Sequence, residues 1–342
     1  AMLAASPRGT QNPRSVSDQP DCESWRMIET KNLKKHFHIG RNQTLHAVDG
    51  ISLSIAENEI LGLVGESGSG KSTFGKTLIG LHERTAGDVF FKGSPLPQKY
   101  TAKDHLRYSA DIQMIFQDPY ASLNPRMTVL DIIGEGLALK GIARAVIQDE
   151  VGFWLRRVGL HPDHMSRFPH EFSGGQRQRI GIARAMIIKP KFVVCDEPIS
   201  ALDVSVQAQV VNLLEDLKDS LGLTLLFIAH DLSMVRYISD RMAVMYLGTL
   251  VESGPSDAVF FEPKHPYTRL LIQSNPEADP VLERTRPSAE LTGEITSPIN
   301  MGPGCRFADR CPEVMPQCKS VTPESRLIAS DHQVACHLYD ER

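Results

Sequence analysis

The sequence predicts an α/β fold built on a parallel sheet that carries a phosphate-binding loop. An apolar run over residues 60–64 reads as a buried strand. It is followed by Gly-Glu-Ser-Gly-Ser-Gly-Lys-Ser at residues 65–72, an unbroken match to the P-loop pattern GxxxxGK[ST]. A second apolar run, residues 192–195, ends in two carboxylates, Asp196 and Glu197. A hydrophobic strand ending in Asp-Glu about 120 residues after a P-loop indicates a site that splits a nucleoside triphosphate.

The P-loop contains the residue types that a phosphate chain needs. Glycines let backbone N–H groups turn inward, and the helix that follows points its positive N-terminal end at the same anion. Lys71 is expected to reach the terminal phosphates, and Ser72 to offer its hydroxyl to magnesium. A glycine-rich turn without a ligand is the alternative, which the full eight-residue match disfavours. The residues predicted to bind the nucleotide here are Gly65, Glu66, Ser67, Gly68, Ser69, Gly70, Lys71, Ser72 and Thr73.

The acidic pair suits two different tasks at the mouth of a parallel sheet. Asp196 suits the magnesium shell, whereas Glu197 suits the water that attacks the γ-phosphate. The pair alone would be weak evidence for a catalytic site, because many strands end in acidic residues where the chain emerges into solvent.

Three shorter motifs occur in a fixed order with these two. They are Phe-Ser-Gly-Gly-Gln at residues 172–176, Ser-Ala-Leu-Asp at 200–203 and Ile-Ala-His-Asp at 228–231. Each alone is unconvincing, since Ser-Gly-Gly-Gln is often a turn and a lone histidine is usually structural. Together they resemble the signature sequence, the D-loop and the switch histidine of ABC ATPases, and Gln117 occupies the Q-loop position.

The resemblance implies an ABC-type P-loop ATPase cassette with a RecA-like core, a helical subdomain and a C-terminal cysteine-containing extension. In this family two cassettes pack head to tail, so the signature of one closes over the nucleotide of the other. Ser-Gly-Gly at a helix N-terminus is a second anion cradle that fits this task. The implied catalytic residues are Glu197, His230 and Gln117; the magnesium ligands are Ser72, Gln117 and Asp196; the further nucleotide-binding residues are Ser173, Gly174, Gly175, Gln176 and Asp203.

Upstream, Phe37 lies at the position where this family stacks an aromatic ring on adenine. An ordinary aromatic in the first strand is the alternative. If the register is displaced, His36 or His38 would supply the ring instead.

The composition limits the kinds of partner and environment that the chain is expected to have. With 342 residues and 41% hydrophobic content, the chain can build a sizeable core and more than one domain. A formal net charge of −4 and a pI near 6.3 give no general basic surface for nucleic acid. Arg177 and Arg179 are expected on a solvated helix face or in salt bridges. The apolar runs are far shorter than the roughly 20 residues that span a bilayer, so any channel must come from other polypeptides.

Three segments are predicted along the chain. Residues 1–25 read as a disordered extension, residues 26–254 as the ATPase cassette with a helical subdomain at about 118–184, and residues 255–342 as a C-terminal extension. The runs 242–247 and 249–252, separated by Gly248, are expected to form a hairpin that closes the cassette.

The C-terminal extension holds four of the six cysteines within 32 residues: Cys305, Cys311, Cys318 and Cys336. An intracellular ATPase should hold few stable disulfides, so clustered thiols more often bind metal. Zinc usually shows paired close spacings, which are missing here, whereas four thiolates can hold an iron–sulfur cluster. The tail resembles the extension of oligopeptide and dipeptide permease ATPases, which implies a 4Fe-4S cluster, with zinc or unliganded thiols as alternatives. Cys195 is expected to be a small buried residue, and Cys22 to lie in the N-terminal extension.

After residue 25 nearly the whole chain resembles the ATP-binding subunit of a peptide-type ABC importer, and residues 122–126 and 197–203 are closer to its F-type than to its D-type subunit. This implies a heterodimer with a second homologous cassette, two transmembrane permease subunits and an extracytoplasmic solute-binding protein. It also implies no nucleic acid and a peripheral location on the cytoplasmic side of the cell membrane. Peptides, nickel chelates, glutathione and opine-like solutes all remain candidate cargo. The rival classes are an exporter ATPase, a soluble ABC ATPase acting on DNA or the ribosome, and a metal-cluster sensor.

Overall fold

A computed structural model of the chain describes residues 26–200, 202–274, 297–329 and 331–340. The predicted α/β fold class is confirmed: two sheets and a set of helices pack around two hydrophobic cores. The predicted N-terminal extension, with Cys22, lies outside the described residues.

The main sheet has eight strands in the order β11-β12-β10-β9-β3-β8-β7-β6. The five strands from β9 to β6 run parallel, so their carboxyl ends lie at one edge. The strand bounds are β3 (Ile60–Val64), β6 (Ile112–Ile115), β7 (Phe192–Asp196), β8 (Thr224–Ile228), β9 (Arg241–Tyr246), β10 (Thr249–Pro255), β11 (Ser325–Ala329) and β12 (His332–Ala335).

The central strands are buried on both faces, and their side chains pack into two different hydrophobic cores, one on each face of the sheet. In β3, Leu61 and Leu63 point into one core, while Ile60 and Val64 point into the other. This alternation follows from the two-residue repeat of a strand, and burial on both faces accounts for the uninterrupted apolar runs in the sequence.

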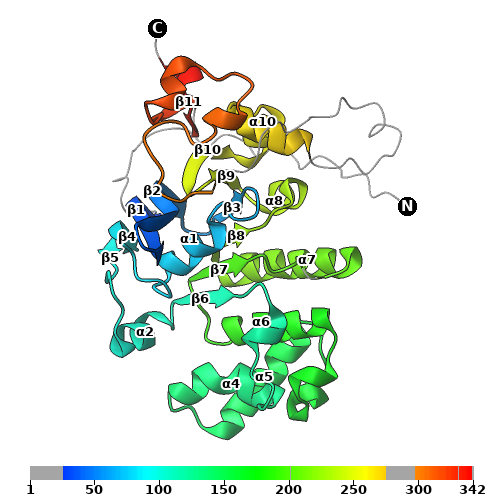
Figure 1. Ribbon diagram of the computed structural model, residues 1–342. Coiled ribbons are helices and arrows are strands. Elements are labelled where there is room, and N and C mark those ends of the chain that lie inside the picture. Colours follow the sequence, from blue (N-terminus) through cyan, green and yellow to red (C-terminus); the bar gives the residue numbers. More distant parts are fainter. Residues whose placement is uncertain (1–25, 201, 275–296, 330, 341–342) are drawn as a thin grey trace, which may run out of the picture.

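An antiparallel sheet covers one face of the main sheet, in the strand order β2-β1-β4-β5. Ile28, Val48 and Ile55 from this sheet share a core with Phe74 and Leu78 of the helix that follows the P-loop. Figure 1 shows that helix, α1, lying close to this sheet. The bounds are β1 (Arg26–Gly40), β2 (Gln43–Ala56), β4 (Ala86–Phe91), β5 (Ser94–Pro95) and α1 (Lys71–Leu78).

Beyond β6 the chain forms a helical layer that Figure 1 shows on the far side of β6 and β7 from the antiparallel sheet. Ile133, Trp154 and Leu155 bury its interior. Thr128 caps the second of its helices by accepting a hydrogen bond from the Asp131 N–H. The helices here are α3 (Pro119–Ser122), α4 (Val129–Leu139), α5 (Arg144–Arg157) and α6 (Gly174–Met186), with 3₁₀ turns η1 (Pro162–Ser166) and η2 (Pro169–Glu171).

The remaining helices connect the strands and cover the sheet. They are α2 (Ala102–Tyr108), α7 (Val204–Leu221), α8 (Leu232–Ile238), α9 (Ser256–Phe261) and α10 (Pro266–Gln273), with 3₁₀ turns η3 (Ala308–Arg310), η4 (Pro316–Lys319) and η5 (His337–Tyr339). None of these helices, nor any other in the described part of the chain, combines the length and apolar character needed to cross a bilayer.

The hairpin of β9 and β10 forms as predicted, but it does not close the sheet. β12 pairs with the outer edge of β10, with Glu252 opposite Val334, and β11 pairs with β12. The C-terminal segment therefore continues the main sheet, because an open β10 edge would leave unpaired N–H and C=O groups.

A buried carboxylate fastens this segment to the core. Glu252 accepts hydrogen bonds from the backbone N–H groups of Lys264 and His265, at 2.8 and 2.9 Å, and its Oε1 lies 2.7 Å from Nε2 of His332. The carboxylate thereby joins β10, the start of α10 and β12.

We expect Glu252→Ala to lower the free energy of unfolding by about 3 kcal/mol, because two buried groups and one half-buried group lose their partner. Urea unfolding measures the loss, and limited proteolysis tests whether the C-terminal segment is released first. Glu262→Ala, which removes an exposed carboxylate from the same region, is the matched control. Equal urea midpoints for the two variants would contradict the expectation.

Candidate functional site

The P-loop depends on glycine at positions where a side chain has no room. Gly65 has a φ of 152°, and a Cβ there would lie 2.1 Å from the backbone oxygen of Met245. Gly70 has a φ of 101°, and its Cβ would lie 2.0 Å from the backbone oxygen of Ala47. The loop is thus pressed between β9 and β2, which explains the glycines of the motif.

The P-loop lysine is held inside this turn. Lys71 is 4% exposed, and its Nζ donates to the backbone oxygens of Gly65 and Glu66 at 2.7 and 3.0 Å. Burial lowers the pKa of Lys71, although the carboxylates of Glu197, Asp196 and Glu66 act in the opposite direction.

Two of the three predicted magnesium ligands meet directly. The Ser72 hydroxyl donates to Oδ1 of Asp196 at 2.6 Å, which brings the start of α1 to the end of β7. Oxygen donors of this kind suit Mg²⁺. The third predicted ligand, Gln117, instead donates from Nε2 to Oε2 of Glu197 at 2.8 Å.

The three predicted catalytic residues come together from the ends of three parallel strands. Glu197 follows β7 in a left-handed conformation, with a φ of 45°. Its Oε2 accepts from Gln117, which follows β6, and lies 3.8 Å from Nδ1 of His230, which follows β8. A carboxylate held between an amide and an imidazole is suited to orient and deprotonate a water molecule.

The adenine-stacking role predicted for Phe37 stays a prediction, and its ring has two close neighbours. It contacts His82 edge-on, with ring centroids 5.6 Å apart, and the Lys35 ammonium lies 4.6 Å from its ring centre. His36 points to the opposite face of β1, where it is bonded to Asp49. His38 lies near the strand end, beside the Thr44 hydroxyl at 3.3 Å.

The signature motif starts a helix with a capping box. The N–H of Gln176 donates to the Ser173 hydroxyl at 3.3 Å, and the N–H of Ser173 donates to Oε1 of Gln176 at 3.0 Å. Gly175 lies against Val206, where a Cβ would approach to 2.6 Å. Figure 1 places this helix, α6, in the helical layer, away from α1 and the P-loop.

The expectation for Arg177 was wrong. Its side chain is 4% exposed, donates to the backbone oxygen of Pro169 and lies over the Tyr120 ring at 3.4 Å, so it braces the signature helix internally. Arg179 donates to the backbone oxygen of Val158 and to the side chain of Gln209.

In the D-loop, Asp203 acts as a helix cap. Its Oδ1 accepts from the Val206 N–H at 3.0 Å and from the Ser205 hydroxyl at 2.7 Å at the start of α7. The hydrogen bond from Ser205 lowers the pKa of Asp203. Its predicted contact with nucleotide stays a prediction.

The four C-terminal cysteines are free thiols that lie in one part of the fold. The Cys305 N–H donates to the Cys318 backbone oxygen at 2.7 Å, and the Cys336 thiol interacts electrostatically with the other three. Burial raises the pKa of Cys305 and of Cys336 to about 11. In the described residues no three of these sulfurs lie within 4.8 Å of one another. Sulfurs around one tetrahedral zinc ion would lie about 3.8 Å apart, so the predicted zinc alternative does not fit this arrangement.

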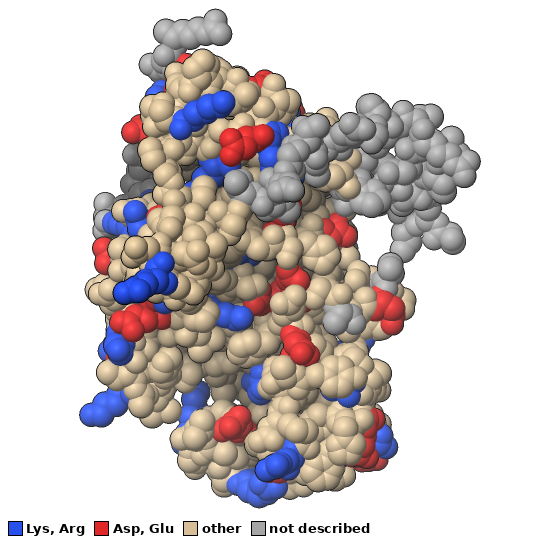
Figure 2. All heavy atoms as spheres, in the orientation of Figure 1, with Lys and Arg blue, Asp and Glu red and all other residues tan. Residues whose placement is uncertain are grey.

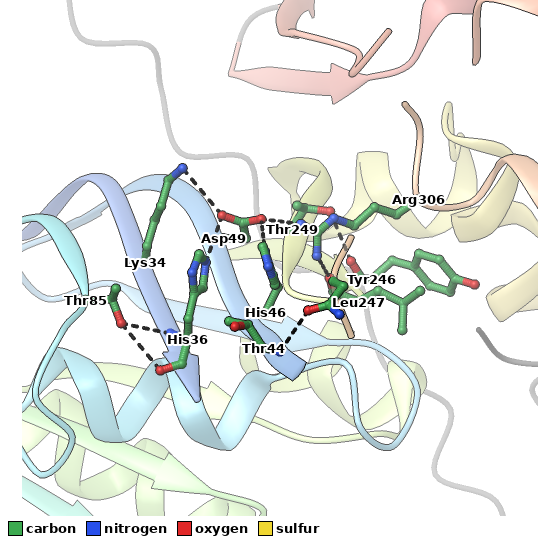
Figure 3. A network of polar contacts seen from close by, with 11 residues as sticks. Lys34, His36, Thr44, His46, Asp49, Thr85, Tyr246, Leu247, Thr249 and Arg306 are labelled. Carbon is green, nitrogen blue, oxygen red and sulfur yellow. Dashed lines mark hydrogen bonds and ion pairs between the residues drawn. The ribbon is translucent and has the colours of Figure 1, made fainter. Parts of the chain in front are cut away.

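A polar network that the sequence did not indicate joins the antiparallel sheet to the C-terminal segment (Figure 3). Asp49 lies 3.1 Å from Nε2 of His36 and 3.0 Å from Nδ1 of His46, and it pairs with Lys34 and Arg306. Burial raises the pKa of Asp49, but the hydrogen bond from His46 and the charge of Arg306 outweigh it and bring the value to about 2. His36, His46 and Asp49 have metal-ligand spacing, yet Lys34 and Arg306 already balance this carboxylate.

A second unpredicted contact reaches the P-loop itself. Arg310 forms two hydrogen bonds with the carboxylate of Glu66, at 2.9 and 3.0 Å. The Tyr267 hydroxyl accepts from the Glu66 N–H at 2.9 Å. The arginine and the glutamate are 244 residues apart in the chain, so no local pattern connects them.

Known proteins are similar to this chain in sequence and in fold. A model of the ABC transporter family matches residues 48–200, and a model of the oligopeptide/dipeptide transporter C-terminal region matches residues 251–318. YkfD of Bacillus subtilis is 53% identical over 318 residues, 92% of this chain and 95% of that protein. The oligopeptide transport ATP-binding protein OppF of Salmonella typhimurium is 50% identical over 307 residues, 87% of this chain and 92% of that protein.

A solved structure agrees with the fold. The ATP-binding cassette MJ0796, in a dimeric post-hydrolysis state with ADP and Pi, is 26% identical with a TM-score of 0.63, over 67% of this chain and 99% of that one. Fold, P-loop and strand-end carboxylates together define an ABC ATPase. The chain belongs to the oligopeptide/dipeptide transporter family of ABC ATP-binding proteins.

Glu197→Gln tests the assignment of the general base. We expect ATP turnover of the assembled complex to fall about 100- to 10,000-fold, because the amide cannot take a proton from the attacking water. ATP binding should persist, since the amide keeps the size of the carboxylate and can still bond to Gln117. The measurements are steady-state ATPase rates and binding of labelled ATP, with the exposed Glu83→Gln as control. Unchanged turnover would remove Glu197 from the role.

Proposed function

We propose that this chain is the ATP-hydrolysing subunit of a membrane importer that takes up peptides. The observation that carries the proposal is the pairing of a complete strand-end site, formed by Lys71, Ser72, Asp196 and Glu197, with a C-terminal region of the oligopeptide transporter type. In support, OppF of Salmonella typhimurium, which is 50% identical to this chain over 307 residues, is an oligopeptide transport ATP-binding protein.

In the proposed mechanism each side chain acts where the strands end. Phe37 stacks on adenine, the P-loop amides surround the phosphates, and Lys71 neutralises the terminal ones. Ser72 and Asp196 would hold Mg²⁺, which when bound offsets the charge of the phosphate oxygens. Glu197 takes a proton from water, with Gln117 holding the carboxylate and His230 facing the γ-phosphate.

Hydrolysis in this proposal needs a second cassette. In support, the signature helix α6 lies in the helical layer, away from the P-loop at the edge of the main sheet (Figure 1), and in the proposal the signature of another chain closes the nucleotide site. The proposed partner is a homologous but nonidentical cassette. ATP would then draw two anion cradles together, and hydrolysis would release them.

A groove beside the Q-loop is the proposed docking place for the permease subunits. It has a volume of about 540 Å³ and lies between the α2 region and the helical layer. Leu106 and Leu139 on its rim are 63% and 72% exposed, and Phe116, next to Gln117, lines it. An apolar helix end from a membrane subunit suits this groove, and the contact would report the state of the γ-phosphate site to the channel.

The surface seen in Figure 2 carries interspersed Lys, Arg, Asp and Glu, without a continuous basic stripe on that face. The proposed location is the cytoplasmic side of the cell membrane, where the subunit binds two permease subunits. An extracytoplasmic solute-binding protein would deliver peptides from the opposite side.

We further propose that the four C-terminal cysteines hold a 4Fe-4S cluster. The supporting observation is that four free, half-buried or buried thiols converge from η3, η4 and the segment after β12 with a spacing too wide for one zinc ion. A cluster places its sulfur ligands farther apart than a single ion does. Cys305, Cys311, Cys318 and Cys336 would be its ligands.

Anaerobic affinity purification from the native membrane tests the importer assignment. We expect recovery with a second cassette and two multi-spanning subunits, identified by mass spectrometry. Leu106→Glu with Leu139→Glu should sharply reduce recovery of the membrane subunits, because two charges would enter the apolar groove. Recovery of the unaltered chain alone, or with ribosomal or DNA-bound proteins, would contradict the importer assignment.

Cys318→Ser tests the cluster. We expect loss of most bound iron and sulfide and a lower melting temperature, because a bound metal group stabilises the fold that holds it. Cys195→Ala, which alters a buried cysteine in β7, is the control and should retain iron. A Cys318→Ser variant that kept both its iron and its stability would exclude a four-cysteine cluster.

A further inference from the structure

Glu66 connects the P-loop lysine to the C-terminal segment. Its backbone oxygen accepts from Lys71 Nζ at 3.0 Å and from the Ser69 N–H at 3.2 Å. Its N–H donates to Tyr267, and its carboxylate binds Arg310. Every polar group of this residue therefore has a partner within the protein, and the nucleotide contact that the motif predicts for Glu66 stays a prediction.

The arginine that binds Glu66 is held in an apolar, aromatic environment. Arg310 is 6% exposed, and its Nη1 also donates to the Tyr246 hydroxyl at 3.3 Å. Phe307 packs against the rings of Tyr246 and Tyr267, with centroids 5.3 and 5.4 Å apart. In such surroundings a two-point arginine–carboxylate pair is short, directional and weakly screened.

The same segment reaches the other end of the loop through Arg306. That arginine binds Asp49 and the backbone oxygen of Leu247 (Figure 3). The neighbouring Gly248 N–H donates to the backbone oxygen of Ser69 at 2.8 Å. Residues 305–311 thus contact the P-loop directly at Glu66. They also connect to it at Ser69 through the turn at Leu247 and Gly248.

We infer that Arg310 is a positioning residue of the ATPase site: it keeps the Glu66 carboxylate away from Lys71, so that the lysine stays available for the phosphates. The Glu66 carboxylate is one of three acidic groups whose charge acts on Lys71. Arg310 pairs with this carboxylate through two hydrogen bonds, whereas Lys71 bonds to the backbone oxygen of the same residue. The C-terminal segment is therefore a part of the nucleotide site as well as an extension of the sheet.

This inference rests on the ATPase assignment, and a double-mutant cycle of charge-neutralising variants in the assembled transporter tests it. Arg310→Gln leaves the Glu66 carboxylate without its partner, so we expect kcat/KM for ATP to fall about 10- to 100-fold, mainly through a higher KM. Glu66→Gln should have a smaller effect. The double variant should be close to Glu66→Gln, because the competing carboxylate is absent.

A purely structural role for Arg310 predicts the opposite order, in which the double variant is at least as impaired as Arg310→Gln. That order, or Arg310→Gln kinetics equal to those of the unaltered complex, would overturn the inference. Arg326→Gln removes a half-exposed ion pair with Asp340 in the same segment and is the matched control. Its KM for ATP should not change.

Melting temperature and iron content, measured on every variant, separate a positioning effect from unfolding or loss of a cluster. If Arg310→Gln does not fold, Arg310→Lys keeps the charge but loses the two-point contact, and a smaller rise in KM is expected. An unchanged KM for a folded Arg310→Lys would then overturn the inference. An unaltered complex without ATPase activity would instead overturn the proposed function, and this inference with it.

Discussion

The shared carboxyl edge of the parallel strands is the constraint on which the site depends. β3 leads into the P-loop, and β6, β7 and β8 deliver Gln117, Asp196 with Glu197, and His230 to the same edge. Apart from the adjacent Asp196 and Glu197, these side chains come from segments that are far apart in the sequence. The strands bring them together because each is buried on both faces and held in register by its neighbours, which leaves the strand ends as the place where polar groups emerge.

Much of this edge could be predicted, because each part has a local signature. The glycines of the P-loop are required by clashes with Met245 and Ala47, and the capping box of Ser173 and Gln176 can be read three residues apart. The core strands were evident as apolar runs. Motifs of this kind span only a few consecutive residues, so they can be recognised in the sequence before the fold is known.

The contacts that escaped prediction are those between distant segments. Arg310 with Glu66 and Arg306 with Asp49 join residues 244 and 257 positions apart, and an arginine beside a cysteine has no pattern that names its partner. Arg177 was misjudged because charge suggests exposure, whereas its guanidinium is buried against Tyr120. The continuation of the sheet into β12 and β11 was not predicted, because β12 is also far from β10 in the chain and the β9–β10 hairpin looked complete.

The pairing of β12 with β10 has a consequence for how the cassette can be divided. A chain cut after residue 254 would end within β10, the strand with which β12 pairs. The N–H and C=O groups on that edge of β10 would then be free to pair with a strand of another chain. Such a fragment is expected to self-associate even though it holds all the ATP motifs. The smallest unit in which the β10 edge is paired therefore includes the C-terminal segment that carries β12. Exchanging that segment between relatives would also require exchanging the β10 residues that pair with it.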